Sequence, residues 1–248
     1  MSKFKLPSIL LFTSILFCCI SSCGNNNNAN CNNGVKDSDE SGVDCGGYCN
    51  ACVAKDFRIK TYTFQSNAYS YTENYNYDNN GRIVSMNNTN GYIETYSYGN
   101  DTIQVSRNDN QLLTYILNSQ GFAVKLHTKY LPAGNYSTSI FKLDLDGHVI
   151  TYVGNPGDIN VWSGGNLVSR TDSNGVLLST TTYFTNKSNT IGNVNFGKYF
   201  LGKSSVNLQN SNVLSNGGTT VFTYEFDALN RVTKYSTSNT GIVSYTYY

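Results

Sequence analysis

The sequence predicts an all-β fold: an antiparallel β-meander of repeated hairpins that forms a curved sheet or half-barrel, preceded by a small disulfide-rich segment. Three observations predict this fold. The 248 residues include 20 tyrosines, and Asn, Ser, Thr and Gly fill much of the remainder. Aromatic and β-branched residues favour strands, while Asn and Gly favour turns. Long runs of helix-forming residues are missing, and a strand–turn–strand unit recurs from Phe57 onward.

Residues 1–22 have the pattern of an export signal. Lys3 and Lys5 precede an apolar run, residues 6–20, that is too short to span a bilayer as a helix. The stretch ISSC, residues 20–23, resembles a bacterial lipobox. This resemblance implies that Cys23 becomes the first mature residue and carries acyl chains, which anchor a protein stably to a membrane. The alternative is an ordinary signal peptide cut nearby, with Cys23 incidental. With Cys23 lipidated, residues 23–30 form a polar tether.

Residues 31–54 form a second segment, which contains four cysteines. An exported protein meets oxidising conditions, so the even number favours two disulfides, with three pairings open. A zinc site is the alternative, because Cys49 and Cys52 have C-x-x-C spacing, but the other two cysteines do not supply a second such pair. The segment is too small for an apolar core of its own, so covalent bonds would hold it. The four residues are Cys31, Cys45, Cys49 and Cys52.

An acidic stretch in this segment matches the first half of an EF-hand loop. The sequence DSDESG, residues 37–42, supplies acidic or hydroxyl ligands at the first, third and fifth positions and glycine at the sixth. The match breaks at the twelfth position, which is Tyr48 instead of glutamate. The sequence therefore favours a solvated acidic turn over a calcium site, and no other cofactor is expected. The weak calcium candidates are Asp37, Asp39, Glu40 and Asp44.

Residues 55–248 form the repeated β domain. Residues 75–98 match residues 224–248 piece for piece: both open with two aromatic residues two apart, continue with aspartate and a turn, and end in Tyr-x-Tyr. Asp78 and Asp227 can accept hydrogen bonds from backbone amides in these turns. Each turn needs a residue with positive φ. The expected residues are Gly81, Gly121, Gly147, Gly165 and Asn230.

This unit resembles the YD repeat of Rhs-type shell proteins. Residues 57–248 as a whole resemble a Bacteroidetes lipoprotein family of unknown function, through the successive landmarks YSYGNDTIQV, LNSQGFAVKL, VWSGGNLVSR, LGKSSVNL and FTYEFDALNRVTKYS. The resemblance implies a lipid-anchored protein of the outer membrane, and it leaves open which leaflet carries the anchor. The family has no assigned activity, so the resemblance implies a class and a location and no chemistry.

Strand parity places the tyrosines on shared faces, because residues two apart point to the same side of a sheet. Paired across hairpins, they form an aromatic strip in which each pair adds about 0.2–1 kcal/mol of stability relative to alanine pairs. A structural role is the favoured interpretation, and an exposed platform for glycan or protein is the other. Tyr245 and Tyr247 should meet the strip of a neighbouring strand. The candidate binding face is Tyr69, Tyr71, Tyr75, Tyr77, Tyr92, Tyr96 and Tyr98.

Composition and motifs argue against two classes of function. The formal net charge is +1 with only 13% charged residues, which gives no basic patch for nucleic acid. Two histidines are present, and no nucleophile, zinc-protease or phosphate-loop motif occurs. We therefore expect a lipid-anchored envelope protein of binding or structural type, and not an enzyme. The alternative is an envelope chaperone or carrier that holds an apolar ligand in a half-barrel cavity.

Overall fold

The computed structural model describes residues 57–153, 157–238 and 241–248, together with Glu40, Gly46, Cys49 and Ala54. Within these ranges the chain is almost entirely β-strand, with two short 3₁₀ helices, η2 and η3. None of the helices in the described part of the chain has the length and apolar character needed to cross a membrane. The predicted all-β class is confirmed.

In the described part of the chain, sixteen strands belong to one antiparallel sheet. Most of them alternate between a buried or half-buried side chain and a more exposed one, as expected for a sheet with one covered face. The first eight are β1 (Ile59–Gln65), β2 (Ser70–Tyr77), β3 (Ile83–Asn88), β4 (Ile93–Tyr98), β5 (Thr102–Arg107), β6 (Gln111–Leu117), β7 (Ala123–Tyr130) and β8 (Tyr136–Leu143). The others are β9 (Val149–Val153), β10 (Ile159–Ser163), β11 (Asn166–Thr171), β12 (Leu177–Ser188), β13 (Asn207–Leu214), β14 (Thr219–Phe226), β15 (Val232–Thr237) and β16 (Gly241–Tyr247).

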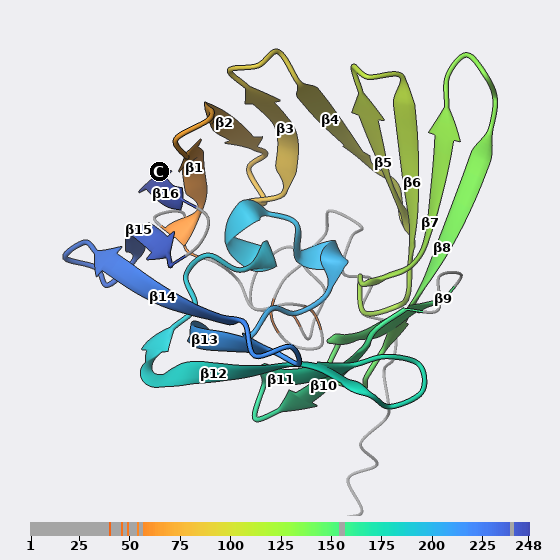
Figure 1. Cartoon of the computed structure of the whole chain (residues 1–248). Helices are drawn as coiled ribbons and strands as arrows, with labels where there is room; N and C mark the ends of the chain where they lie inside the picture. The colour runs from red at the N-terminus through yellow and green to blue at the C-terminus, as the bar shows by residue number, and fades with distance from the viewer. Residues whose placement is uncertain are drawn as a thin grey trace, which may run out of the picture.

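Strands that are neighbours in sequence are also neighbours in the sheet, which confirms the predicted meander. The one exception is the junction of β9 and β10, which has no backbone ladder. The first and last strands pair with each other, from Ile59 opposite Tyr247 to Gln65 opposite Ile242. This pairing closes the sheet into the nearly complete barrel seen in Figure 1. The edge strands of the sheet are therefore β9 and β10, and these two strands contact each other in place of standing as open edges.

One turn conformation recurs six times around the barrel. The side-chain oxygen Oδ1 of an Asp or Asn accepts hydrogen bonds from the backbone amides two and four residues later. The residue three positions later has positive φ, as the sequence predicts for Gly81, Gly121, Gly147 and Asn230; Gly165 also has positive φ, in the turn between β10 and β11. The six turns begin at Asp78, Asn88, Asn118, Asp144, Asp172 and Asp227.

The two most similar repeats share a further arrangement. Arg82 Nε donates to Asp78 Oδ2 at 2.8 Å, and Arg231 Nε donates to Asp227 Oδ2 at 2.6 Å. Each guanidinium also lies 4.5 Å from the ring centroid of a tyrosine sixteen residues later, Tyr98 for the first and Tyr247 for the second. Cation–π contacts of this kind contribute about 0.5–2 kcal/mol. Each arginine therefore links its turn to the end of a strand further along the sheet, β4 for Arg82 and β16 for Arg231.

Six β-bulges explain what many inward-pointing aromatic residues do. A bulge inserts one extra residue into a strand and disrupts the ladder there. In each of the six, the carbonyl of the residue just before the extra one accepts a hydrogen bond from an aromatic side chain on the next strand, at 2.6–3.0 Å. A buried carbonyl without a partner costs free energy, so these bonds stabilise the bulges. The pairs are Tyr77 with Ile59, Tyr98 with Ile83, Trp162 with Val149, Tyr183 with Leu167, Tyr224 with Gln209, and Tyr247 with Val232.

The same rule closes the seam between β9 and β10. Trp162 Nε1 and Asn160 Nδ2, both on β10, donate to the Val149 carbonyl on β9 at 3.0 and 2.9 Å. The Trp162 ring stacks on His148, with centroids 4.3 Å apart. Side chains thus hold together the one junction between sequence neighbours that lacks a backbone ladder. Trp162 is half-buried in the β10–β11 hairpin.

The segment between β12 and β13 runs inside the barrel, as Figure 1 shows for the light-blue chain. We call residues 189–206 the inner segment; it contains η2 (Asn193–Phe196) and η3 (Tyr199–Leu201). Its backbone bonds to the strand starts and turns of one rim: the amides of Lys203 and Val206 donate to the carbonyls of Gly147 and Gly165. At the same rim the Val232 amide donates to Thr190 Oγ1 at 3.0 Å. The inner segment therefore lies across one end of the barrel.

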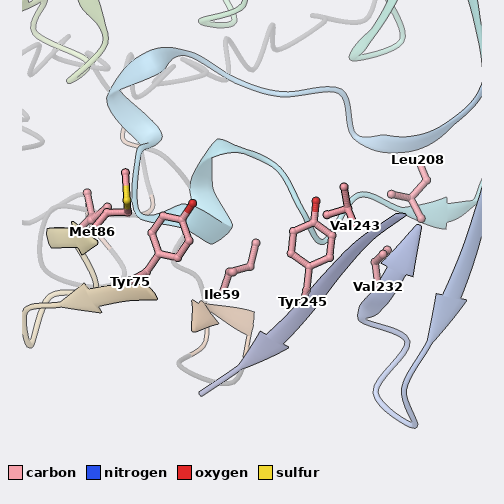
Figure 2. Close-up of a cluster of buried hydrophobic side chains, with 8 residues drawn as sticks. Ile59, Tyr75, Met86, Leu208, Val232, Val243 and Tyr245 are labelled. Atoms are coloured by element: carbon pink, nitrogen blue, oxygen red, sulfur yellow. The ribbon is translucent and has the colours of Figure 1, made fainter. Parts of the chain in front are cut away.

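The apolar core is the contact between this segment and the barrel wall. One cluster is formed by wall residues from β1, β2, β3, β13, β15 and β16 (Figure 2), against which Ile191 and Phe196 of the inner segment pack. A second joins Tyr199 and Phe200 of η3 to β5, β6 and β7. Ile59, Ile83 and Val232, the first residues of three strands, are fully buried. The core is thus concentrated at the end that the inner segment covers.

The outer face of the barrel is mainly polar. Side chains that alternate with the inward tyrosines pair across strands through hydroxyl, amide and charged groups. Thr63 Oγ1 lies 2.9 Å from Thr72 Oγ1, and Lys234 Nζ donates to Glu225 Oε1 at 2.7 Å. Further pairs of this kind are Thr61 with Thr246, Asn76 with Ser85, His127 with Thr138, Thr182 with Ser211, and Thr223 with Ser236. Cross-strand polar pairs add modestly to sheet stability and keep this face hydrated.

Alanine substitutions at two glycines of the recurring turn can distinguish the cost of backbone strain from the cost of steric overlap. Gly147 and Gly175 have φ of 92° and 82°, so alanine at either position adopts a disfavoured conformation at a cost of about 1–2 kcal/mol. A Cβ at Gly175 meets open space, whereas one at Gly147 overlaps the Phe122 ring. We expect Gly147→Ala to lower the free energy of unfolding by about 1–3 kcal/mol more than Gly175→Ala in chemical denaturation. Equal losses would contradict the packing described at this turn.

The bonds to bulge carbonyls can be tested by removing one hydroxyl. Tyr98→Phe leaves the Ile83 carbonyl without its 2.6 Å donor, so we expect it to lower the free energy of unfolding by about 1–3 kcal/mol. Tyr69→Phe is the matched control, because Tyr69 is 60% exposed. Chemical denaturation of both variants measures the difference. A Tyr98→Phe variant as stable as the control would show that water replaces the hydroxyl without loss.

Candidate functional site: an aromatic cavity inside the barrel

A cavity of about 280 Å³ lies between the inner segment and the wall formed by β12 to β16. The wall contributes aromatic rings, and the inner segment and β13 contribute amide, hydroxyl and aliphatic side chains. We call this the belt cavity. Its lining residues are Tyr183, Asn189, Ile191, Ser205, Asn207, Leu208, Gln209, Phe222, Tyr224, Tyr235 and Tyr245.

The rings of the cavity continue around the inner wall as an uninterrupted row, which we call the aromatic belt. Five tyrosines, one from each of β2, β1, β16, β15 and β14, follow one another with ring centroids 5.7–6.2 Å apart. The row passes through the β1–β16 junction, so it exists only because the barrel closes there. The belt consists of Tyr69, Tyr71, Phe64, Tyr62, Tyr245, Tyr235, Tyr224 and Phe222.

The belt runs from solvent to the cavity. Tyr69, which stacks on Tyr71 at 6.4 Å, is 60% exposed beside the β1–β2 turn. At the other end Phe222, Tyr224 and Tyr235 are half-buried, so parts of their rings remain accessible. Partly exposed aromatic rings in a concave surface are a usual feature of binding sites for small molecules. The arrangement can therefore hold a ligand against ring faces along the wall.

The polar groups around the cavity are held in fixed orientations. Asn189 Nδ2 donates to the Ser205 carbonyl at 2.8 Å, while its Oδ1 accepts from the Ile191 amide at 3.0 Å. Asn207 Oδ1 accepts from Asn166 Nδ2 at 3.0 Å. A side-chain amide has two donor hydrogens and two lone pairs, so each keeps capacity for a ligand. Within the described part of the chain, the side-chain amide of Gln209 makes no hydrogen bond.

None of the described lining residues is an Asp, Glu, Lys, Arg or His. The only titratable groups are tyrosines. Burial, followed by neighbouring tyrosines, raises the pKa of Tyr245 and of Tyr224 above the ordinary tyrosine value. Burial likewise raises the pKa of Tyr235. The cavity is therefore uncharged at neutral pH.

A second feature of the inner wall is a buried carboxylate with several partners. Glu94 is only 4% exposed and accepts hydrogen bonds from the hydroxyls of Tyr92 and Tyr96. Its carboxylate also forms an ion pair with Arg107 at 2.9 Å. Lys198 of the inner segment lies 3.7 Å away. Burial alone would raise the pKa of Glu94, but Lys198, the two tyrosines and Arg107 together lower it. These contacts explain Glu94 as a paired structural charge that helps to attach the inner segment to β4.

One group of side chains has the composition of a metal site. Asp144, Asp146 and His148 offer ligand atoms within 4.8 Å of one another. They belong, however, to the recurring turn: Asp144 Oδ1 accepts from the amides of residues 146 and 148, and its Oδ2 lies 2.9 Å from His148 Nδ1. His148 thus occupies the position that Arg82 and Arg231 hold in the equivalent turns. The turn conformation accounts for the cluster without a metal.

The structure divides the seven tyrosines of the predicted binding face among four places. Tyr69 and Tyr71 lie in the aromatic belt. Tyr92 and Tyr96 bind Glu94, and Tyr75 is buried against Phe196 of the inner segment. Tyr77 and Tyr98 donate to bulge carbonyls. Five of the seven lie on strands β2 and β4, whereas Tyr69 and Tyr92 directly precede these strands.

The predicted lipidation, disulfide and calcium residues lie almost wholly outside the described residues. These are Cys23, Cys31, Cys45, Cys52, Asp37, Asp39 and Asp44. Cys49 is described as disulfide-bonded, but its partner is not among the described residues. Glu40 is buried, and its Oε1 lies 3.0 Å from Cys49 Sγ. The disulfide-rich segment, its pairing and the calcium candidates therefore stay predictions.

Sequence reasoning missed most of the belt. The missed residues alternate along their strands in the same way as the seven tyrosines of the predicted binding face, so strand parity could have included them. They are Tyr62 and Phe64 on β1, Phe222 and Tyr224 on β14, and Tyr235 on β15. The expectation that Tyr245 meets a neighbouring strip is confirmed by its contacts with Tyr62 and Tyr235. No sequence signal identifies the cavity residues of the inner segment, because that segment has no strand periodicity.

Comparison with solved structures finds the same fold in two porin-like proteins. The crystal structure of a porin-like protein from Bacteroides uniformis ATCC 8492 has a TM-score of 0.61 and 19% sequence identity, covering 77% of this chain and 96% of that one. A porin-like protein from Bacteroides vulgatus ATCC 8482 has a TM-score of 0.51 and 14% identity, covering 77% and 98%. Similarity at this level of identity establishes the barrel fold and no function.

No model of a known protein family matches the chain, and no curated protein matches it. The crystal structure of TcdB2-TccC3-TEV has a TM-score of 0.18, which is too low to carry an argument. The resemblance to YD-repeat proteins and to a Bacteroidetes lipoprotein family therefore stays a prediction.

The inner tyrosines predict a loss of stability at alkaline pH. Burial raises the pKa of Tyr115 and of Tyr247 to about 12, against about 10 in an unfolded chain. A group whose pKa is raised by folding contributes stability that is fully present below pH ~10 and is lost as pH rises toward the folded value. We expect the free energy of unfolding to fall between pH 10 and 12, and absorbance at 295 nm to show delayed tyrosine ionisation. Constant stability across this range would contradict the burial of these hydroxyls.

Proposed function

We propose that this chain is a lipid-anchored cell-envelope protein whose barrel binds a glycan along its inner aromatic wall. The observation that carries the proposal is the aromatic belt, which leads from exposed Tyr69 to a cavity lined by rings and fixed amides. Aromatic faces with a few oriented polar groups suit a ligand that has both apolar faces and hydroxyls.

The polar outer face favours a barrel held at the membrane surface by a lipid anchor over a barrel embedded in the bilayer. The outer surface of a barrel embedded in a bilayer carries an apolar band, with polar residues inside. Here the outer positions form polar pairs such as Thr61 with Thr246 and Lys234 with Glu225, and the inner positions are aromatic. Lipidation at Cys23 would keep such a barrel at the membrane surface. The porin-like description of the two similar structures applies to those proteins.

The position of the inner segment favours ligand binding inside the barrel over conduction of solutes through it. Its bonds to Gly147, Gly165 and Val232 place residues 189–206 across one end of the barrel. The two hydrophobic clusters pack this segment against the wall, so that end is filled with side chains. A barrel that is filled at one end acts as a cup, and its ligand enters and leaves by the other end.

A carrier for an apolar ligand is the second candidate, and one observation favours it. A further cavity of about 240 Å³ lies between the inner segment and His148, with Val194, Tyr199 and Val206 among its lining residues. The belt cavity, in contrast, is not lined by Leu, Ile and Phe alone. Tyrosines and side-chain amides make up most of its lining. Amide and hydroxyl groups left without partners by an apolar ligand would cost free energy, so the belt cavity favours a glycan.

The anchor has a direct test. Mass spectrometry of protein from a host with a lipoprotein pathway should find a mature chain that begins at modified Cys23. Cys23→Ala should release the protein from membranes, because the acyl chains are its proposed attachment and the outer face is mainly polar. Cys49→Ala is the matched control for loss of a cysteine and should leave the protein in the membrane fraction. Retention of Cys23→Ala in membranes would contradict the anchor.

Glycan binding and apolar carriage predict different outcomes for the purified protein. We expect a glycan array to show bound neutral oligosaccharides and organic extraction of the protein to yield no stoichiometric lipid. Tyr235→Ala should weaken the array signal at least tenfold, because it removes a central ring of the belt. Tyr136→Ala, on a side chain that is 69% exposed on the outer face, should not. An empty array with a co-purified lipid would support the carrier instead.

A further inference from the structure

The lining of the belt cavity selects among glycans, and this inference rests on the proposed function. We propose that the belt cavity is a subsite for a single neutral pyranose unit, stacked on Phe222 and Tyr235 and hydrogen-bonded by the side-chain amide of Gln209. Charged sugars such as uronates are excluded from it. Three properties of the cavity carry the proposal: its size, its lack of charge and the positions of its free polar groups.

The size of the cavity suits one sugar ring. Its volume of about 280 Å³ corresponds to roughly nine waters at about 30 Å³ each. That space accommodates a pyranose with its hydroxyls but no extended chain. A longer glycan would therefore place one unit in the cavity and leave the remaining units along the belt, where ring centroids repeat every 5.7–6.2 Å toward Tyr71.

The lack of charge sets the ligand class. A carboxylate or ammonium group that enters the cavity would lose hydration, and none of the described lining residues could pair with it. Burying an unpaired charge is far more costly than burying a hydroxyl that finds a hydrogen bond. The charged residues nearby already have partners: Glu73 on β2 accepts a hydrogen bond from the Tyr75 hydroxyl, and Glu94 pairs with Arg107 and with Lys198 of the inner segment on the β4–β5 side. The ligand is therefore neutral.

The polar groups have the complementarity that a sugar needs. Phe222 lies 6.3 Å from Tyr235 and 6.5 Å from Tyr224, so three half-buried rings form one wall. Asn189 and Asn207 line the same cavity and are oriented by their own hydrogen bonds. Gln209 lies on the same strand as Leu208 and, within the described residues, has an uncommitted amide. Hydroxyls of a sugar ring stacked on Phe222 can then form hydrogen bonds with these amides in place of water.

The test uses the full-length mature protein in detergent and two probes of equal length, cellotetraose and tetragalacturonate. Isothermal titration should show binding of the neutral probe and at least tenfold weaker binding of the charged one. Saturation-transfer NMR on the wild-type protein should show transfer from aromatic protons to ring protons of one cellotetraose unit more strongly than to the others. This measurement needs no variant, so a misfolded mutant cannot decide the outcome.

Matched variants locate the subsite. Gln209→Glu places a carboxylate in the cavity and should weaken cellotetraose binding at least tenfold, whereas Gln104→Glu on the exposed outer side of β5 should not. Phe222→Leu should weaken it similarly, and Phe222→Tyr should restore it. Cellotetraose that binds with unchanged affinity to Gln209→Glu and Phe222→Leu would overturn the subsite while leaving glycan binding intact. Equal affinity for tetragalacturonate would overturn the neutral class. Failure of all array glycans to bind would refute the proposed function itself.

Discussion

The barrel depends on one kind of hydrogen bond, in which an aromatic side chain on one strand donates to the carbonyl that a bulge has freed on the strand before it. Among the described residues the bond occurs six times, five times from a tyrosine hydroxyl and once from the Trp162 indole. Bulges bend and twist the strands that carry them, which a sheet needs in order to close. Because each of these six bulges frees a carbonyl, closure without the six donors would cost free energy repeatedly around the ring.

This constraint gives the inner tyrosines two distinct tasks. Those near the end covered by the inner segment, such as Tyr77 and Tyr247, use their hydroxyls on the backbone. Those nearer the other end, such as Tyr71 and Tyr62, pack ring against ring in the belt. Tyr224 does both, because its hydroxyl binds the Gln209 carbonyl while its ring lines the cavity. The structural bonds at one end thereby fix the position of the rings that a ligand would contact at the other.

The extent to which sequence predicts this molecule follows from the range of each interaction. Strand alternation and the turns at Asp78 and Asp227 are local, so parity and turn chemistry predict them. Tyr71 and Tyr77 have the same local pattern, yet one lies in the belt and the other serves a bulge, because the difference depends on the neighbouring strand. The β1–β16 pairing and the path of residues 189–206 depend on contacts far apart in sequence. The belt cavity needs both, so its lining could not be read from the chain.

The account joins a polar exterior, a filled end and an aromatic inner wall into one claim: the barrel is a cup whose ligand lies against the belt. Hydroxyl-radical footprinting of the protein in its own membranes, with and without added neutral oligosaccharide, tests this most directly. The account predicts that oxidation of Phe222 and Tyr235 falls when the oligosaccharide is present, while oxidation of Tyr136 on the outer face stays constant. Unchanged oxidation of the belt, or protection confined to the outer face, would contradict it.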